Sequence, residues 1–198
     1  MAMDQVHDLQ QVYRKILHSM SHPGTISNLE PFAEKVDYDL PCYEATFLSA
    51  MTLLDAEVTF AIISENSQQL STKLTAYTLA KSAPIHEADY IIVLQDALQQ
   101  DIVEALQQCK IGNLIDPQFS STWFLESSGI VNQAELLLTG PGIKDETELQ
   151  IGLTKELWTT RNKRVKEYPL GIDLICLDNE ANLVCVPRTT KIEILEVV

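Results

Sequence analysis

The chain has 198 residues, and 45% of them are hydrophobic and 21% charged, which excludes a disordered or fibrous protein and indicates a folded domain with a substantial core. The net charge of −14 would repel the phosphates of a nucleic acid, so we expect no nucleic-acid binding. The apolar runs are far shorter than the roughly 20 residues that span a bilayer, and the polar, acidic start lacks a secretory pattern. We therefore expect a cytoplasmic protein without a membrane segment.

The first half of the chain alternates helical and strand patterns. Apolar residues that recur every three or four positions indicate helices, and unbroken β-branched and aromatic runs indicate buried strands. The first helix is expected to end near residue 21, because Pro23 disfavours helical geometry before it and Gly24 permits a turn. In chain order, we predict a helix over 6–20, a helix over 43–55, a strand over 58–63, a helix over 67–82 and a strand over 88–94.

The second half continues this alternation and ends in a hairpin. Polar residues at 178–182 suit a turn between the last two strands. In chain order, we predict a helix over 101–108, strands over 122–125 and 134–139, a helix over 147–161, and strands over 172–177 and 183–186. The whole pattern predicts an α/β fold in one domain, residues 1–198, with a sheet that helices cover on one or both faces.

Cysteine and histidine residues give little sign of metal or redox chemistry. The cysteines form no C-x-x-C pair and no zinc-finger spacing, so in a cytoplasmic protein we expect reduced, buried thiols. His18 and His22 stand four apart, the separation at which two imidazoles on a helix can share a metal. No neighbouring carboxylate or thiol completes a set, and Pro23 frays the turn that contains His22, so we expect no metal site. The cysteines are Cys42, Cys109, Cys176 and Cys185.

The segment Gly140-Pro141-Gly142 has two interpretations. It follows a predicted strand and precedes a predicted helix, where backbone amides can bind a phosphate. It matches neither the dinucleotide-binding motif nor the P-loop, and acidic residues follow it. A plain turn that uses the conformational freedom of Gly140 and Gly142 is the favoured alternative.

Polar residues near the C-terminus form a second candidate site. Asp173 lies early in a predicted strand, where it can bind a ligand or accept hydrogen bonds from backbone amides. Arg188 and Thr189 follow the last predicted strand, and a cation beside hydroxyl groups can hold an oxyanion. Alternatively, Arg188 pairs with a carboxylate such as Asp173 and fixes the hairpin, or it contacts another subunit.

Three stretches of the sequence together resemble the PhnH family of the bacterial carbon–phosphorus lyase system. They are residues 13–24, with the sequence YRKILHSMSHPG, residues 138–143, with LTGPGI, and residues 168–175, with YPLGIDLI, continuing to VPRTT at 186–190. Their order and separation match the family across nearly the whole chain.

This resemblance implies a three-layer α/β/α sandwich with a mixed sheet. Such a fold is similar to that of pyridoxal-phosphate-dependent transferases but lacks their cofactor site, and the family tends to form homodimers. No lysine here has a convincing Schiff-base context, so we expect no cofactor.

The resemblance also implies partner subunits and a role. PhnH-like proteins join PhnG, PhnI and PhnJ in a core complex that transfers a phosphonate to ribose C1 of a nucleoside triphosphate with release of adenine. PhnI is then the catalytic subunit of that step, and PhnJ breaks the carbon–phosphorus bond by radical chemistry. The chain has no iron–sulfur cysteine pattern, so the resemblance implies an accessory, non-catalytic subunit.

The sequence also leaves two rival interpretations open. In one, a stand-alone phosphoryl- or glycosyl-handling transferase holds an anion with Arg14, Arg188 and the Gly140–Gly142 loop. In the other, the chain is a pyridoxal enzyme, which the missing lysine context disfavours. The residues that we expect to contact a ligand or another subunit are Arg14, His22, Gly140, Gly142, Asp173, Arg188 and Thr189.

Overall fold

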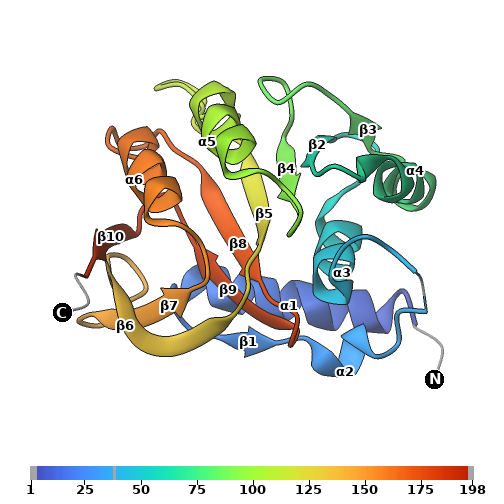
Figure 1. Cartoon of the computed structure of the whole chain (residues 1–198), viewed down its shortest axis with the longest axis horizontal. Helices are drawn as coiled ribbons and strands as arrows, with labels where there is room; N and C mark the ends of the chain where they lie inside the picture. The colour runs from blue at the N-terminus through green and yellow to red at the C-terminus, as the bar shows by residue number, and fades with distance from the viewer. Residues whose placement is uncertain (1–3, 38, 196–198) are drawn as a thin grey trace.

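A computed structural model describes residues 4–37 and 39–195. The described residues form two β-sheets and a set of helices (Figure 1). The helices are α1 (His7–Ser21), α2 (Glu30–Ala33), α3 (Glu44–Leu53), α4 (Ser67–Thr78), α5 (Gln99–Gln108) and α6 (Lys155–Arg164). None of these helices is long and apolar enough to cross a membrane.

The larger sheet of the described residues has seven strands in the order β1-β9-β8-β5-β4-β2-β3. Neighbouring strands from β3 to β8 pair in parallel, whereas β9 runs antiparallel to β8, and β1 antiparallel to β9. The α/β class and the mixed sheet are therefore confirmed. The strands are β1 (Ser27–Asn28), β2 (Thr59–Ile63), β3 (Lys81–Ser82), β4 (Tyr90–Val93), β5 (Thr122–Glu126), β8 (Asp173–Leu177) and β9 (Asn182–Val186).

Both faces of this sheet are buried. Along β4, Ile91 and Val93 belong to one apolar cluster, and Ile92 belongs to another. Because successive side chains of a strand point to opposite faces, the two clusters lie on opposite sides of the sheet. Residues of α5 and α6 join the first cluster, and residues of α1, α3 and α4 join the second. Helices on both faces explain why the central strands are continuously apolar.

A smaller sheet corrects one prediction. Its strands are β6 (Ile130–Thr139), β7 (Thr147–Ile151) and β10 (Lys191–Ile194), in the order β10-β6-β7. The predicted helix over 147–161 is therefore wrong in its first part, because residues 147–151 pair antiparallel with β6. Leu149 and Ile151 alternate as strand residues and are buried, and α6 starts only after Gly152. Thr154 caps α6, since its side chain accepts a 3.3 Å hydrogen bond from the Leu157 amide.

The predicted hairpin of β8 and β9 is confirmed, and one buried aspartate holds its turn. Asp178 is 2% exposed and accepts hydrogen bonds from the backbone amides of Glu180 (3.0 Å) and Asn182 (2.9 Å). It also accepts a bond from the amide of Ile130 (3.0 Å), at the start of β6. The hairpin turn is thereby tied to the small sheet.

Candidate functional site

Asp173 and Arg188 form a half-buried ion pair at one end of the hairpin. The Arg188 Nε lies 3.3 Å and 3.2 Å from the two carboxylate oxygens of Asp173, and its backbone amide donates to the same carboxylate at 2.8 Å. The guanidinium also donates to the Pro117 carbonyl at 2.8 Å and to the Ser120 hydroxyl. Of the alternatives open from the sequence, the geometry matches the pairing that fixes the hairpin, and it adds the loop at 117–120 to the same network.

The Gly140–Gly142 loop is shaped by close backbone approach. Gly140 (φ +134°) and Gly142 (φ +86°) both have positive φ values. A Cβ atom on Gly140 would lie 2.9 Å from the Thr189 carbonyl oxygen, and one on Gly142 would lie 2.4 Å from the Ser21 carbonyl oxygen. Side chains at these positions would clash with backbone, so the loop is glycine-rich for packing. The helix expected directly after it, which a phosphate site would require, is strand β7 instead.

His22 is the C-cap residue of α1, and Arg14 lies within that helix. His22 caps the C-terminus of α1, directly between Ser21 and Pro23, whose atoms approach Gly142. Its Nδ1 lies 3.1 Å from the His18 carbonyl oxygen, and the two imidazole rings are 4.4 Å apart. Arg14 is exposed two turns earlier in the helix. Among the described residues, no group of three or more histidine, cysteine, aspartate or glutamate side chains is arranged to hold a metal.

A shallow cavity lies beside the ion pair. Its volume is about 330 Å³, and Thr189 contributes to its lining. Tyr168, which is joined to Pro169 by a cis peptide bond, is 76% exposed at its rim. Its other lining residues are Pro117, Gln118, Pro169, Asp173, Pro187 and Arg188. The cavity therefore brings together three of the residues expected from the sequence, namely Asp173, Arg188 and Thr189.

The cysteine thiols are not activated. All four are free, as expected, and Cys109, Cys176 and Cys185 are buried, whereas Cys42 is only partly buried. Burial raises the pKa of the Cys185 thiol to about 12 and raises the pKa of Cys42 and Cys176 even further. Because the thiolate is the nucleophilic form, these cysteines are unsuited to covalent catalysis at neutral pH.

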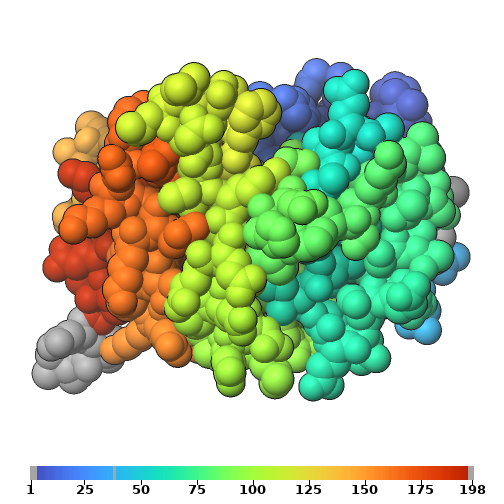
Figure 2. Space-filling model, turned by 90° about the horizontal axis from the view of Figure 1, so that it is seen from above, coloured from blue at the N-terminus to red at the C-terminus, as the bar shows by residue number. Residues whose placement is uncertain are grey.

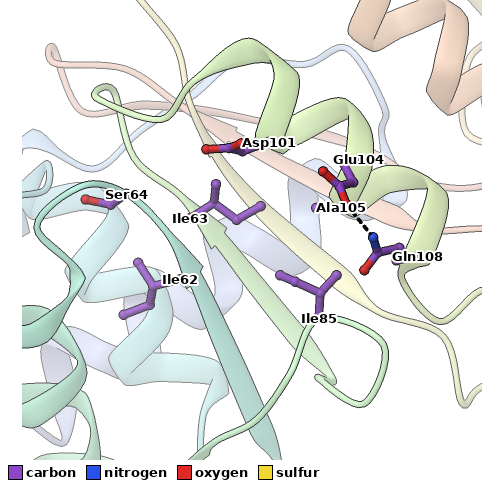
Figure 3. Close-up of a pocket in the computed structure, with 8 residues that line it drawn as sticks. All are labelled: Ile62, Ile63, Ser64, Ile85, Asp101, Glu104, Ala105 and Gln108. Carbon is purple, nitrogen blue, oxygen red and sulfur yellow. Dashed lines mark hydrogen bonds between the residues drawn. The ribbon is translucent and has the colours of Figure 1, made fainter.

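A separate groove lies beside β2, where the order of successive strands in the large sheet reverses direction. The chain passes from β2 to the edge strand β3 and then to β4 on the other side of β2, and the carboxyl ends of such strands are a common ligand position. Asp101 and Glu104 of α5 face Ile63 and Ser64 across this groove of about 340 Å³ (Figure 3). Its polar lining is acidic, which disfavours phosphate or phosphonate anions.

Comparison with known proteins decides the family. A family model described as "Bacterial phosphonate metabolism protein (PhnH)" matches residues 2–193. The chain belongs to the PhnH family. It is 28% identical over 195 residues to the alpha-D-ribose 1-methylphosphonate 5-triphosphate synthase subunit PhnH of Rhizobium meliloti (strain 1021), with 96% of this chain and 92% of that protein covered. It is 27% identical over 191 residues to the putative C-P lyase subunit protein HtxG of Stutzerimonas stutzeri, with 93% and 86% covered.

The stretches that resembled PhnH are joined in the structure. Gly142 of the middle stretch lies against Ser21 and Pro23 of the first, and Gly140 lies against Thr189 of the last. The first and last stretches also meet, because the Ser19 hydroxyl accepts a 2.8 Å hydrogen bond from the Cys185 amide, one residue before VPRTT. The PhnH pattern thus describes one packed junction between α1, the loop after β6 and the end of the hairpin.

A buried arginine in this junction was missed from the sequence. Arg161 of α6 is fully buried and donates to the carbonyl oxygens of Thr190 (2.8 Å) and Pro187 (2.7 Å). Burial lowers the pKa of Arg161 to about 10, and the nearby carboxylate of Asp173 counteracts this effect. The available signal was its place four residues after Leu157, on the buried face of the helix.

A buried glutamate was missed as well. Glu126 ends β5, is 4% exposed, and accepts hydrogen bonds from the amides of Tyr43 (2.7 Å) and Gln95 (3.1 Å). Burial raises the pKa of Glu126 above its usual value. The side chain thereby holds the segment before α3 against the end of β4. No local motif marks this role, because its partners lie 83 and 31 residues away.

Proposed function

We propose that this chain is an accessory subunit of the carbon–phosphorus lyase core complex. In this role it supports transfer of a phosphonate to ribose C1 of a nucleoside triphosphate, with release of adenine, during phosphonate catabolism. The observation that carries the proposal is the PhnH family match over residues 2–193, together with relatives whose names describe subunits of a C-P lyase and of a ribose-methylphosphonate-triphosphate synthase.

The proposed partners are PhnG, PhnI and PhnJ, and the isolated chain is proposed to form a homodimer. The proposed location is the cytoplasm. We further propose one PhnH-like domain over residues 1–198 with a three-layer fold similar to pyridoxal-phosphate-dependent transferases but without their cofactor site. Helices on both faces of a mixed sheet support this likeness.

The proposed non-catalytic role is supported by the internal hydrogen bonds that already engage the polar groups of the PhnH junction. Arg188 already donates to Asp173, Pro117 and Ser120, and this network leaves it poorly placed to bind a substrate anion. This arrangement argues against the alternative, a stand-alone transferase that uses Arg188 and the Gly140–Gly142 loop. The expected residues Arg14, His22, Gly140, Gly142, Asp173, Arg188 and Thr189 remain proposed contacts with a ligand or a subunit.

An apolar patch next to this junction is the surface that we assign to subunit contact. Leu114, Ile115 and Phe119 are 65%, 88% and 60% exposed on the loop whose Pro117 carbonyl accepts a bond from Arg188. Tyr168 is exposed at the cavity that Pro117 also lines. Large apolar side chains in such a group favour burial against another chain.

The test is coexpression with PhnG, PhnI and PhnJ from the same source. The chain is expected to copurify with them in a fixed ratio, and Ile115→Glu is expected to reduce recovery at least about tenfold, since the charge would be buried at the contact. Leu98→Glu, at an exposed leucine before α5, is the matched control and should copurify normally. A folded wild-type chain that fails to associate would overturn the proposed function. Equal recovery of the two variants would show that the subunit contact does not include the apolar patch around Ile115.

A further inference from the structure

The few basic residues of this acidic chain are unevenly distributed. Five of its 14 lysine and arginine residues fall within residues 155–166, although the whole chain carries a net charge of −14. These residues belong to α6 and the segment directly after it. Helix α6 packs beside α5 on one face of the large sheet, where it is the orange segment of Figure 2. This end of the molecule is therefore a local region of positive charge.

Three of these cations line a cleft that no part of the proposed function uses. Lys163, Arg164 and Lys166 surround a cleft of about 510 Å³, together with the apolar side chains of Ile111 and Leu170. Glu167 is the single carboxylate in its lining. The charge in this lining is opposite to that of the groove beside β2, which Asp101 and Glu104 line.

The cations of the cleft are available to a ligand. Lys163 and Lys166 are exposed, and neither forms an ion pair with any residue that the structure describes. Arg164 is fixed in place by a 2.8 Å hydrogen bond from Nη2 to the Cys109 carbonyl oxygen. Its Nε is shielded from solvent and has no hydrogen-bond partner among the described residues. A buried donor of this kind is costly unless a ligand or water satisfies it.

A structural role for these cations accounts for only part of the arrangement. Basic residues in the last turn of a helix interact favourably with its dipole, which suits Lys163 and Arg164 at the end of α6. Lys166 lies beyond the helix and still lines the same cleft. Three positive groups around one hollow match a ligand that carries several negative charges along its length.

We propose that this cleft binds an oligophosphate chain, of the kind carried by a nucleoside triphosphate. The lysines and Arg164 would bind the phosphate oxygens, and Ile111 and Leu170 offer an apolar wall for a sugar or base. The inference rests on the proposed function only for the identity of the nucleotide. In that role, the cleft holds the triphosphate end of the substrate while another subunit performs the chemistry.

The experiment is isothermal titration of the purified full chain with inorganic tripolyphosphate. Wild type is expected to bind, with an affinity that falls as salt increases. Lys163→Gln combined with Lys166→Gln is expected to weaken binding about tenfold or more, because two charge-assisted contacts are lost. Lys155→Gln, at an exposed lysine on the opposite end of α6, is the matched control and should bind within about twofold of wild type.

One variant is expected to gain affinity. Glu167→Gln removes the only carboxylate from the lining and should strengthen tripolyphosphate binding severalfold. Absence of measurable binding by folded wild type would overturn the proposal. Equal losses of affinity in the double variant and in Lys155→Gln would also overturn it, because they would indicate general charge attraction. An unchanged affinity in Glu167→Gln would overturn it as well.

Two further measurements complete the experiment. One distinguishes a nucleotide from a free phosphate chain as the ligand, and the other distinguishes failure of this inference from failure of the proposed function. Tighter binding of ATP than of tripolyphosphate identifies a nucleotide, and the reverse order identifies the phosphate chain alone; both support an oligophosphate site. Selective binding of an acidic peptide in place of either phosphate ligand would contradict it. Copurification with the sister subunits in the absence of any phosphate binding would overturn this inference and leave the accessory-subunit role intact.

Discussion

Gly142 shows how narrowly the loop after β6 fits the end of α1. Its φ of +86° is unfavourable for other residues, and a Cβ atom there would lie 2.4 Å from the Ser21 carbonyl oxygen. We predict that Gly142→Ala lowers the free energy of unfolding by about 1–3 kcal/mol, measured by urea denaturation. Gly129→Ala is the control, since its Cβ would meet nothing within 4 Å. Equal free energies of unfolding for the two variants would show that the junction accommodates a Cβ atom at residue 142 without loss of stability.

Glu126 gives the protein a specific pH dependence. Burial raises its pKa in the folded state above the usual value, so the folded state binds the proton more tightly than the unfolded state. The stabilisation is therefore fully present below the unfolded pKa and is lost as the pH rises through the folded pKa. We predict that the stability of wild type relative to Glu126→Gln increases as the pH is lowered from neutral toward the unfolded pKa, in denaturation curves at several pH values. A constant difference would contradict the shifted pKa.

The ion pair of Asp173 and Arg188 joins β8, the end of β9 and the loop at 117–120. Their side chains are 22% and 17% exposed, so solvent screens them less than a surface pair. A double-mutant cycle with Asp173→Asn and Arg188→Met is expected to give a coupling energy of about 1 kcal/mol or more. The exposed pair of Asp4 and His7 is the reference and should show much weaker coupling. Comparable values would mean that the Asp173–Arg188 network adds little to the hairpin.

Most helices and central strands could be predicted from the sequence, because their apolar spacing is unambiguous. The predicted helix over 6–20 is α1 (His7–Ser21), and the predicted strand over 58–63 contains β2. Strand β7 was mistaken for helix because Leu149, Leu153 and Leu157 happen to recur every four residues. Pairing with β6, which precedes it in the chain, decides its conformation. The sequence of residues 147–151 does not by itself reveal this pairing. The two-residue strand β1 and the edge strand β10 were missed for the same reason. The helix predicted over 67–82 was too long, because α4 ends at Thr78 and Lys81–Ser82 form β3.

The candidate site was predictable in its residues but not in its contacts. Asp173 and Arg188 were singled out, and their pairing was one of the alternatives. The choice between these alternatives depends on how the 117–120 loop folds over Arg188, about 70 residues away in the chain. Arg161 was missed because a basic residue near a helix end is usually exposed, whereas this one is held by two backbone carbonyl groups.

At the scale of the whole molecule, charge and polar pairing both favour dependence on partner chains. The net charge of −14 disfavours the gathering of phosphonate and triphosphate anions over most of the surface. Arg161 and Arg188 of the PhnH junction are committed to internal contacts. Five of the 14 lysine and arginine residues fall within residues 155–166, and three of them line the cleft at the end of α6. These features support the proposed role, in which the chain holds one end of a substrate for another subunit.

Reconstitution of the synthase reaction is a direct test of the accessory role proposed for this chain. Formation of alpha-D-ribose 1-methylphosphonate 5-triphosphate and adenine from ATP and methylphosphonate would be followed with this chain alone, with its sister subunits alone, and with all of them together. We predict no product from the chain alone, little from the sister subunits without it, and full activity when it is added in its fixed ratio. Product formed by this chain alone, or an unchanged rate in its absence, would contradict its role as an accessory subunit.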